Sequence, residues 1–465
     1  MTTTGELLST VRRPPARRSF GDFVRRANHR GELVVQPRMG FGEPARMRSG
    51  LAATRAAAAT TVGTITVDSY TRLGELAAAA ESIRTGQLLN GYPLASHPID
   101  TTRAMLAGIA GDGFPVQVRH GSANPRHIFA ALIAAGLDAT EGGPVSYCLP
   151  YGRVPLVDSV RHWRDCCELF ARLQDRGVEP HLETFAGCML GQLCPPSQLI
   201  ALSVLEAMFF RQHGLRCVSV SYAQQTNQAQ DREAVAALRR LCRRLLPDLN
   251  WHVVIYAYMG VYPTSPSGAR RLLAHAAELA AESGAERLIV KTVVEAVRIP
   301  TIEENRDALE VAAATARATA RVGSDDEPGA DSQIYQEAVA LIEAVLELDT
   351  DVGAALRVAF LRGYLDIPFC LHPDNRGQTR SYLDDSGRLR WADIGKLPLG
   401  TVVDVGRRER VDCATLMASL SYMRQKYDGA SGYPGEVPEL SGPARPKSNP
   451  ARVPIGATAE EESQP

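Results

Sequence analysis

The sequence predicts an α/β protein, a (β/α)8 barrel of the TIM type with an appended smaller C-terminal region. Short strand-like runs alternate with amphipathic helices from about residue 31 to residue 302, as expected for repeated βα units. The strand runs are apolar on both faces, which is typical of parallel sheets that are covered on both sides. A length of 465 residues accommodates one large barrel with an appendix, or two domains. Together these observations favour a barrel over an open parallel sheet.

Nine runs compete for the eight strand positions of a barrel. They are ELVVQP, TTVGTITVD, QLLNGYP, FPVQVRH, GPVSYCLPY, EPHLETFA, CVSVSYA, WHVVIYAYM and RLIVKTVVE. The sequence does not decide which run is extra, and QLLNGYP is the weakest. Helices are expected between the runs because their apolar residues recur at helical spacing and because most of them end at Gly or Pro. The clearest helices span residues 71–86, 159–177, 197–214, 231–247 and 267–284.

The chain divides into four parts by composition and pattern. Residues 1–30 contain seven arginines and form a basic, partly helical surface extension. The barrel with three additional helices spans 31–365, and an α+β region rich in turns spans 366–430. Residues 431–465 have the Pro, Gly, Ser and Glu bias of disordered segments.

Composition excludes several classes of protein. The net charge of −1 argues against binding to nucleic acid or to an anionic membrane. No apolar run approaches the roughly 20 residues of a membrane span. Arg17-Arg18 superficially resembles a twin-arginine export signal but lacks the apolar segment that must follow. The nine cysteines show neither CxxC pairs nor zinc-ligand spacing, so we expect reduced thiols, no metal site in this chain and a cytoplasmic location.

The residues that could carry chemistry are concentrated in residues 115–151. PVQV and PVSYCLPY read as strands, with a helix over HIFAALIAAGL between them, so this stretch forms a β-α-β unit. Its polar residues lie where the strands end, which is where parallel α/β proteins place their active sites.

Three arginines follow apolar strand runs. Arg38 comes after VVQP, Arg72 after VDSYT, and Arg119 ends PVQVR. Guanidinium groups at neighbouring strand ends would converge on one pocket and offer forked donors that suit carboxylates. The alternative is three unrelated surface arginines.

A second group comprises Glu141, Tyr147, Tyr151 and His120. The first three share parity, so an ideal strand would turn them to one face. The carboxylate could accept from an ammonium group while the phenols bind a carboxylate. The alternatives are packing aromatics, a helix-end glutamate and a structural histidine. Lys291 and Glu295 form a third candidate site, because a lysine at a buried strand end needs an anionic or hydroxyl-rich partner, although the two could simply pair with each other.

Taken together, the ordered motifs VVQPRMG, SYTR, LLNGYP, QVRHG, EGGPVSYCLPY, CPPS, VKTVVEAVRIPT and LDIPF resemble the large (epsilon) subunit of methylaspartate mutase, also called glutamate mutase. The resemblance covers residues 30–430. It implies an isomerase, an adenosylcobalamin-dependent carbon-skeleton mutase that interconverts L-glutamate and L-threo-3-methylaspartate by radical fragmentation and recombination.

The resemblance also implies roles for particular residues. Arg38, Arg72 and Arg119 would grip the two substrate carboxylates, Glu141 would receive the ammonium, and His120, Tyr147 and Tyr151 would line the same pocket. The cofactor would contact the positions Gly40, Asn90, Pro150, Lys291 and Glu295.

A second chain is implied as well. The cobalamin-binding signature Asp-x-His-x-x-Gly is absent from the sequence. In the family a small sigma subunit carries it, so we expect cobalt to be ligated by that partner, in a heterotetramer built on a homodimer of this chain.

The sequence departs from the family pattern at Pro144, at VVEAV and around residues 256–263. A paralogous mutase for a related amino diacid, or a barrel that binds an acidic amino acid without catalysis, are the alternative functions.

Overall fold

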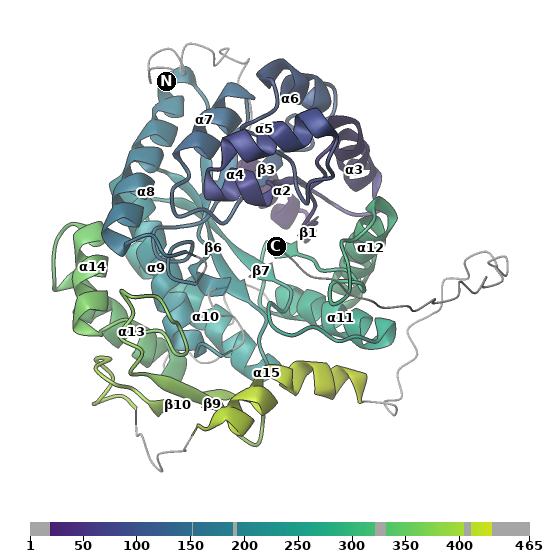
Figure 1. The fold of residues 1–465 in the computed structure, drawn as a ribbon. Coiled ribbons are helices and arrows are strands. Elements are labelled where there is room, and N and C mark those ends of the chain that lie inside the picture. The colour runs from purple at the N-terminus through teal and green to yellow at the C-terminus, as the bar shows by residue number, and fades with distance from the viewer. Residues whose placement is uncertain (1–18, 151, 189–192, 321–331, 404–410, 430–465) are drawn as a thin grey trace, which may run out of the picture. The chain divides into compact units, whose positions relative to one another are not determined.

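The computed structural model describes residues 19–150, 152–188, 193–320, 332–403 and 411–429. Its main feature is a parallel eight-stranded sheet that runs in the order β1-β8-β7-β6-β5-β4-β3-β2, and a bridge between Val35 and Thr61 joins β1 to the segment leading into β2. Helices surround the strands in Figure 1, so the predicted (β/α)8 barrel is confirmed. The strands are β1 Val34–Gln36, β2 Gly63–Thr66, β3 Val116–Arg119, β4 Ala139–Glu141, β5 His181–Glu183, β6 Cys217–Ala223, β7 Asn250–Tyr256 and β8 Arg287–Ile289.

The helices of the barrel follow the sequence pattern closely. They are α3 Pro44–Ala56, α4 Ser69–Leu73, α5 Leu76–Thr85, α6 Ile99–Leu106, α7 Arg126–Ala134, α8 Leu156–Ala171, α9 Pro196–Gln212, α10 Gln228–Leu245, α11 Pro266–Glu282 and α12 Ile302–Ala318. The helix expected over residues 71–86 is divided into α4 and α5, because Gly74 takes a left-handed conformation (φ 81°) and ends α4.

Two of the nine strand predictions require correction. PVSYCLPY is not a strand, because the fourth strand lies just upstream at Ala139–Glu141 and residues 144–150 form turns. Pro144 has no N–H to donate, and the N–H groups of Val145 and Ser146 donate to the buried carboxylate of Glu206 rather than to a strand. QLLNGYP is the extra run, because it contributes only an isolated bridge between Val67 and Tyr92.

Helix α2 (Phe20–His29) packs against the barrel strands. Phe20, Val24 and Ala27 are buried, and the ring of Phe20 stacks on His181 with a centroid separation of 4.8 Å. The described end of the predicted basic extension is therefore helical, with its apolar face packed against the barrel and Arg25 and Arg30 exposed on the surface. Residues 1–18 lie outside the described residues.

The C-terminal elements cover the outside of the barrel. Helices α13 (Gln333–Leu346) and α14 (Val352–Arg362) pack on α9, which explains why nearly every residue of α9 is buried. The antiparallel hairpin of β9 (Arg380–Leu383) and β10 (Leu389–Asp393) lies near α13, as Figure 1 shows. Helix α15 (Cys413–Asp428) packs on α11. The four domain boundaries remain predictions, and the tail 431–465 lies outside the described residues.

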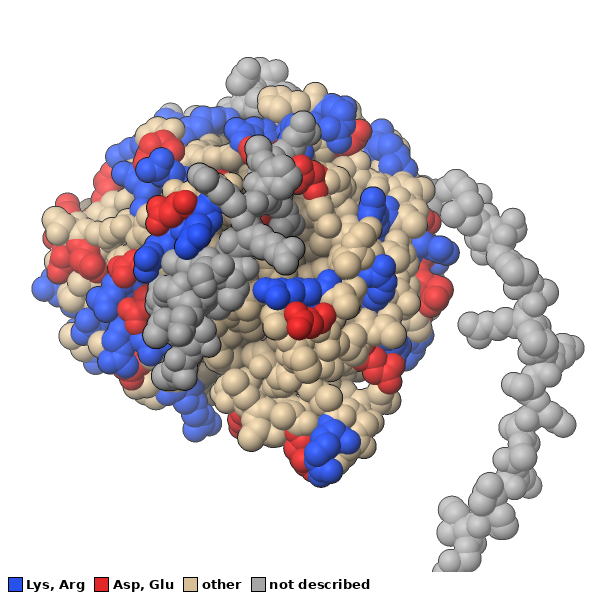
Figure 2. Space-filling model, turned by 90° about the horizontal axis from the view of Figure 1, so that it is seen from above, with Lys and Arg blue, Asp and Glu red and all other residues tan. Residues whose placement is uncertain are grey.

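The described helices lack a membrane-spanning segment, and the face drawn in Figure 2 carries charges of both signs. Within the described residues, every helix is either too short or too polar to serve as a membrane-spanning segment. Figure 2 shows basic and acidic side chains interspersed over the face seen from above, in keeping with the net charge of −1.

Candidate active site

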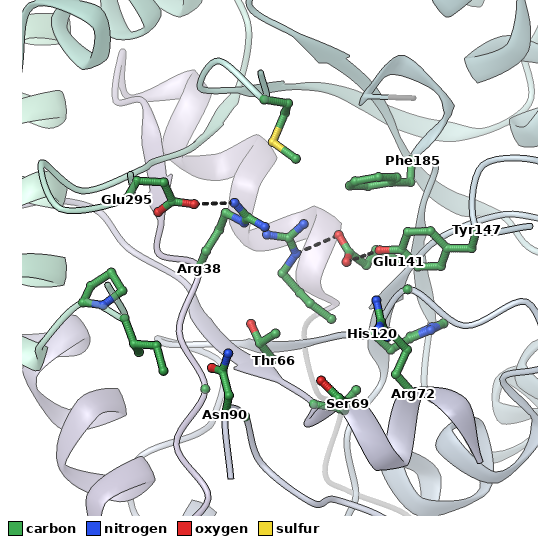
Figure 3. Close-up of a pocket in the computed structure, with 18 of the residues that line it drawn as sticks. Arg38, Thr66, Ser69, Arg72, Asn90, His120, Glu141, Tyr147, Phe185 and Glu295 are labelled. Atoms are coloured by element: carbon green, nitrogen blue, oxygen red, sulfur yellow. Dashed lines mark hydrogen bonds and ion pairs between the residues drawn. The ribbon is translucent and has the colours of Figure 1, made fainter. Parts of the chain in front are cut away.

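A polar cavity of about 460 Å³ opens at the C-terminal ends of the strands. That end of a (β/α)8 barrel is where its active sites are found. Figure 3 shows how side chains from several strand ends turn toward one another around the cavity. The lining residues are Arg38, Gly40, Thr66, Val67, Ser69, Arg72, Asn90, Gly91, Arg119, His120, Gly121, Glu141, Tyr147, Phe185, Met259, Glu295, Arg298, Ile299 and Pro300.

All three predicted arginines line this cavity. Arg38 follows β1, Arg72 lies on α4 after β2, and Arg119 is the last residue of β3. Parallel strands therefore bring to one place three cations that are far apart in sequence. The alternative of unrelated surface arginines is wrong, whereas the role of each arginine in binding remains a prediction.

The arginines differ in how far their hydrogen bonds are already satisfied. Arg119 is buried and donates from Nε to Glu141 at 2.7 Å. The Nη1 of Arg38 donates to Glu295 at 2.8 Å. The Nε of Arg72 is buried and has no acceptor among the described residues. A buried donor without an acceptor is costly, so Arg72 favours an anion in the cavity.

Glu141 lies at the centre of a hydrogen-bonded cluster. Its Oε2 accepts from Arg119 and, at 2.8 Å, from the hydroxyl of Tyr256, while its Oε1 accepts from the hydroxyl of Tyr147. Burial works to lower the pKa of Arg119, but the Glu141 carboxylate and the nearby phenols hold it well above its ordinary value. Arg119 therefore remains charged in the cavity wall.

His120 is a neutral hydrogen-bond donor. Burial, together with the neighbouring His127 and Arg119, lowers the pKa of His120 to about 3, so the ring carries no charge at neutral pH. Its Nδ1 accepts from the N–H of Ser122 at 3.1 Å, which places the ring proton on Nε2. That Nε2 is buried and has no partner among the described residues. His120 thus offers one N–H to a ligand and cannot act as a base through Nδ1.

Lys291 and Glu295 form a second cluster beside the arginines. The Nζ of Lys291 lies 3.4 Å from Glu295 and 5.0 Å from the centroid of the Tyr262 ring. Burial lowers the pKa of Lys291 to about 8, and Arg38 adds to this effect while Glu295 opposes it. The hydroxyls of Thr292 and Tyr262 are buried without partners among the described residues. Glu295 lines the cavity, whereas Lys291 is buried and is not among the lining residues.

The structure assembles most of the residues predicted from the sequence, but not all. Gly40 and Asn90 line the cavity, and Gly40 is required there because a Cβ would lie 2.2 Å from the carbonyl oxygen of Thr66. Pro150 is outside the lining, and Tyr151 lies outside the described residues. Glu141 and Tyr147 do meet, but across a turn rather than on one face of a strand.

Several site residues were missed by the sequence reasoning. Thr66, Ser69, Phe185, Met259 and Arg298 line the cavity, and Tyr256 reaches its wall through Glu141. Most follow a strand within a few residues, so the rule that located the arginines could have located them too.

No group of three or more His, Cys, Asp or Glu side chains in the described part of the chain has the geometry to hold a metal ion. Three guanidinium groups beside the Glu141 carboxylate are complementary to an organic anion that also carries a hydrogen-bond donor.

Fold and site define the class of protein, a TIM-type barrel with a polar, arginine-lined cavity at the C-terminal ends of its strands. The sequence matches the family described as "Methylaspartate mutase E chain (MutE)" over residues 14–416. The chain therefore belongs to the methylaspartate mutase E chain family, which confirms the resemblance drawn from its motifs.

Curated relatives agree with this assignment. The glutamate mutase epsilon subunit of Yersinia enterocolitica is 31% identical over 352 residues, which are 72% of this chain and 72% of the relative. The epsilon subunit of Halobacterium salinarum is 31% identical over 357 residues, 75% of this chain and 74% of the relative. That of Treponema denticola is 28% identical over 413 residues, 84% and 83% of the two chains.

Proposed function

We propose that this chain is the catalytic subunit of an adenosylcobalamin-dependent mutase that interconverts L-glutamate and L-threo-3-methylaspartate. The observation that carries the proposal is the convergence of Arg38, Arg72 and Arg119 with Glu141 in one cavity. A dicarboxylate with one ammonium group is complementary to three cations and one carboxylate. Membership of the mutase family and relatives named glutamate mutase support the same substrate.

Each end of the substrate has a matching group in the cavity. The guanidinium groups would bind the two carboxylates through paired N–H donors, and Glu141 would accept from the ammonium. The free Nε2–H of His120 and the hydroxyl of Tyr147 would add donors, with Tyr151 expected nearby. Holding both ends of a diacid keeps its fragments aligned while its carbon skeleton rearranges.

The cofactor would lie against the Lys291–Glu295 side of the cavity. The residues there fit the hydroxyl-rich sugar of an adenosyl group, because Lys291 and Glu295 offer a donor and an acceptor and the Thr292 hydroxyl is buried without a partner. Gly40, Asn90 and Pro150 are the further contacts we propose. When bound, adenosylcobalamin supplies the carbon radical that removes a substrate hydrogen.

We propose that a small sigma subunit with an Asp-x-His-x-x-Gly motif supplies the cobalt ligand, because this chain has no such motif. The relatives carry the word "subunit" in their names, which supports an assembly of two kinds of chain. A heterotetramer around a homodimer of this chain is the arrangement we propose, in the cytoplasm.

Reconstitution tests the proposal. The chain is mixed with a cobalamin-binding sigma subunit, adenosylcobalamin and L-glutamate, and 3-methylaspartate is measured together with the cob(II)alamin signal by electron paramagnetic resonance. We expect both, and expect neither when the chain or the sigma subunit is left out. The absence of both signals, with a sigma subunit that has been shown to bind the cofactor, would refute the proposal.

Glu295→Gln is expected to strengthen the binding of L-glutamate to the cofactor-free chain. The carboxylate of Glu295 holds Nη1 of Arg38 at 2.8 Å, and this donor must turn away to form a fork with a substrate carboxylate. The side chains of Arg38 and Glu295 are 34% and 20% exposed, so removal of the pair should lower Kd by about twofold to fivefold, measured by calorimetric titration. Glu282→Gln, which breaks the Arg232 pair outside the cavity, is the matched control. An equal or weaker affinity in Glu295→Gln would show that Arg38 binds substrate without leaving Glu295.

A further inference from the structure

Glu206 is a buried carboxylate that lies outside the cavity. It contacts two loops that form part of the cavity wall. It is on α9 and has no exposed surface. Its Oε1 accepts from the N–H groups of Val145 at 3.1 Å and Ser146 at 2.9 Å, and its Oε2 accepts from the Ser146 hydroxyl at 3.0 Å. A hydrogen bond from the backbone of Ala186, in the loop after β5, also stabilises the carboxylate.

The chain around Glu206 is shaped for this contact. Gly143 passes so close that a Cβ there would lie 2.1 Å from the Glu206 carboxyl group. Gly142 has a φ of 126°, and a Cβ on it would lie 2.5 Å from the rings of Tyr147 and Trp163. Both positions therefore require glycine, which lets the turn fold over the carboxylate.

The two loops that donate hydrogen bonds to Glu206 each carry a side chain that lines the cavity, and these two side chains lie next to each other. Tyr147 follows Ser146 directly and donates to Glu141. Phe185 precedes Ala186, and its ring packs on Tyr147 with a centroid separation of 4.8 Å. Both side chains line the cavity, whereas Glu206 does not. The orientation of Tyr147 toward Glu141 thus depends on a turn that has no strand partner and is held by Glu206.

We propose that Glu206 is a positioning residue for the substrate site, which acts by fixing the turn of residues 142–147 and hence the contact of Tyr147 with Glu141. The expected loss of activity rests on the proposed function, whereas the hydrogen bonds between Glu206 and the turn do not depend on it. Burial raises the pKa of Glu206 to about 7, although the hydrogen bonds from Ser146, Val145 and Ala186 work against this. Such a buried carboxyl group is maintained against its desolvation cost by the donors around it.

Asp231 provides a matched control for this kind of buried carboxyl group. It lies on α10, is buried, and accepts from the Tyr222 hydroxyl and from the N–H of Gln225 in the loop after β6. Burial raises its pKa to about 7 as well. Neither of these two hydrogen-bond partners lines the cavity.

The test is a double-mutant cycle in the reconstituted enzyme with the variants Glu206→Gln, Tyr147→Phe and their combination, beside Asp231→Asn. The amide has one acceptor oxygen instead of two and carries no charge, so its hydrogen bonds with the Val145 and Ser146 N–H groups should weaken and the turn should loosen. We expect Glu206→Gln to lower kcat/KM about 10- to 100-fold, with a double variant little worse than the poorer single variant, because both act through one contact. Asp231→Asn should change kcat/KM less than threefold. Additive losses in the cycle, or an equal loss in Asp231→Asn, would overturn the role of Glu206.

Hydrogen exchange of the Val145 and Ser146 amides tests, without any substrate, whether Glu206 holds the turn of residues 142–147. We expect exchange at least 10-fold faster in Glu206→Gln than in the wild type, and unchanged in Asp231→Asn. Unchanged exchange in Glu206→Gln would show that Glu206 does not hold this turn. An inactive wild-type mixture would instead refute the proposed function, and the exchange measurement would still stand.

Discussion

Arg119→Lys is expected to lower kcat/KM of the reconstituted enzyme by about 10²- to 10⁴-fold. Arg119 donates from Nε to Glu141 and from Nη2 to the Tyr256 hydroxyl at 3.3 Å, and it has one edge left for a substrate carboxylate. An ammonium group cannot make these contacts together, since it lacks the planar fork. Loss of two hydrogen bonds to charged groups costs about 3–6 kcal/mol, which at 1.36 kcal/mol per tenfold corresponds to the expected loss.

The control is Arg239→Lys. Arg239 is also buried and paired, with Glu286 at 2.9 Å, but it lies outside the cavity. Both variants should unfold at similar denaturant concentrations, while only Arg119→Lys should lose activity. Normal kinetics in Arg119→Lys would remove the arginine cluster from the mechanism and with it the main support for a diacid substrate.

The features that the sequence predicted well depend on local patterns. The period of the strand runs and the helices between them defined the barrel, and the position of Arg38, Arg72 and Arg119 after successive strands located the cavity. Neither inference needed knowledge of which side chains touch. A parallel barrel brings its strand ends together whatever the connecting helices contain.

The features that were missed depend on contacts between distant residues. The β-branched and aromatic residues of PVSYCLPY indicate a strand locally, but the backbone donors of Val145 and Ser146 bind a carboxylate 60 residues away or more. The short-range pattern contains no trace of Glu206. Tyr256 was missed for a similar reason, because its hydroxyl reaches Glu141 across the barrel interior.

The largest expected loss of stability lies below the cavity, in the ion pair of Arg287 and Glu183. Arg287 is completely buried, donates from Nη2 to Glu183 and to the Ser219 hydroxyl at 3.0 Å, and donates from Nη1 to Gln36. Burial works to raise the pKa of Glu183, but Arg287 and the Tyr256 hydroxyl keep it below its ordinary value. Arg287→Met would leave this buried carboxylate without its ion-pair partner. We expect a loss of about 3–5 kcal/mol in the free energy of unfolding, measured by urea denaturation.

The double variant Arg287→Met with Glu183→Gln separates the cost of the unpaired charge from that of lost packing. Removing both charges should restore much of the stability, because a buried ion pair adds little beyond a neutral pair of similar volume. Arg244→Met, which breaks the exposed pair with Glu343, should change stability only slightly. If Arg287→Met proved as stable as the wild type, Glu183 would have to be neutral in the folded barrel. If the single variant lost stability and the double variant recovered none of it, packing around Arg287 rather than charge would stabilise this part of the barrel interior.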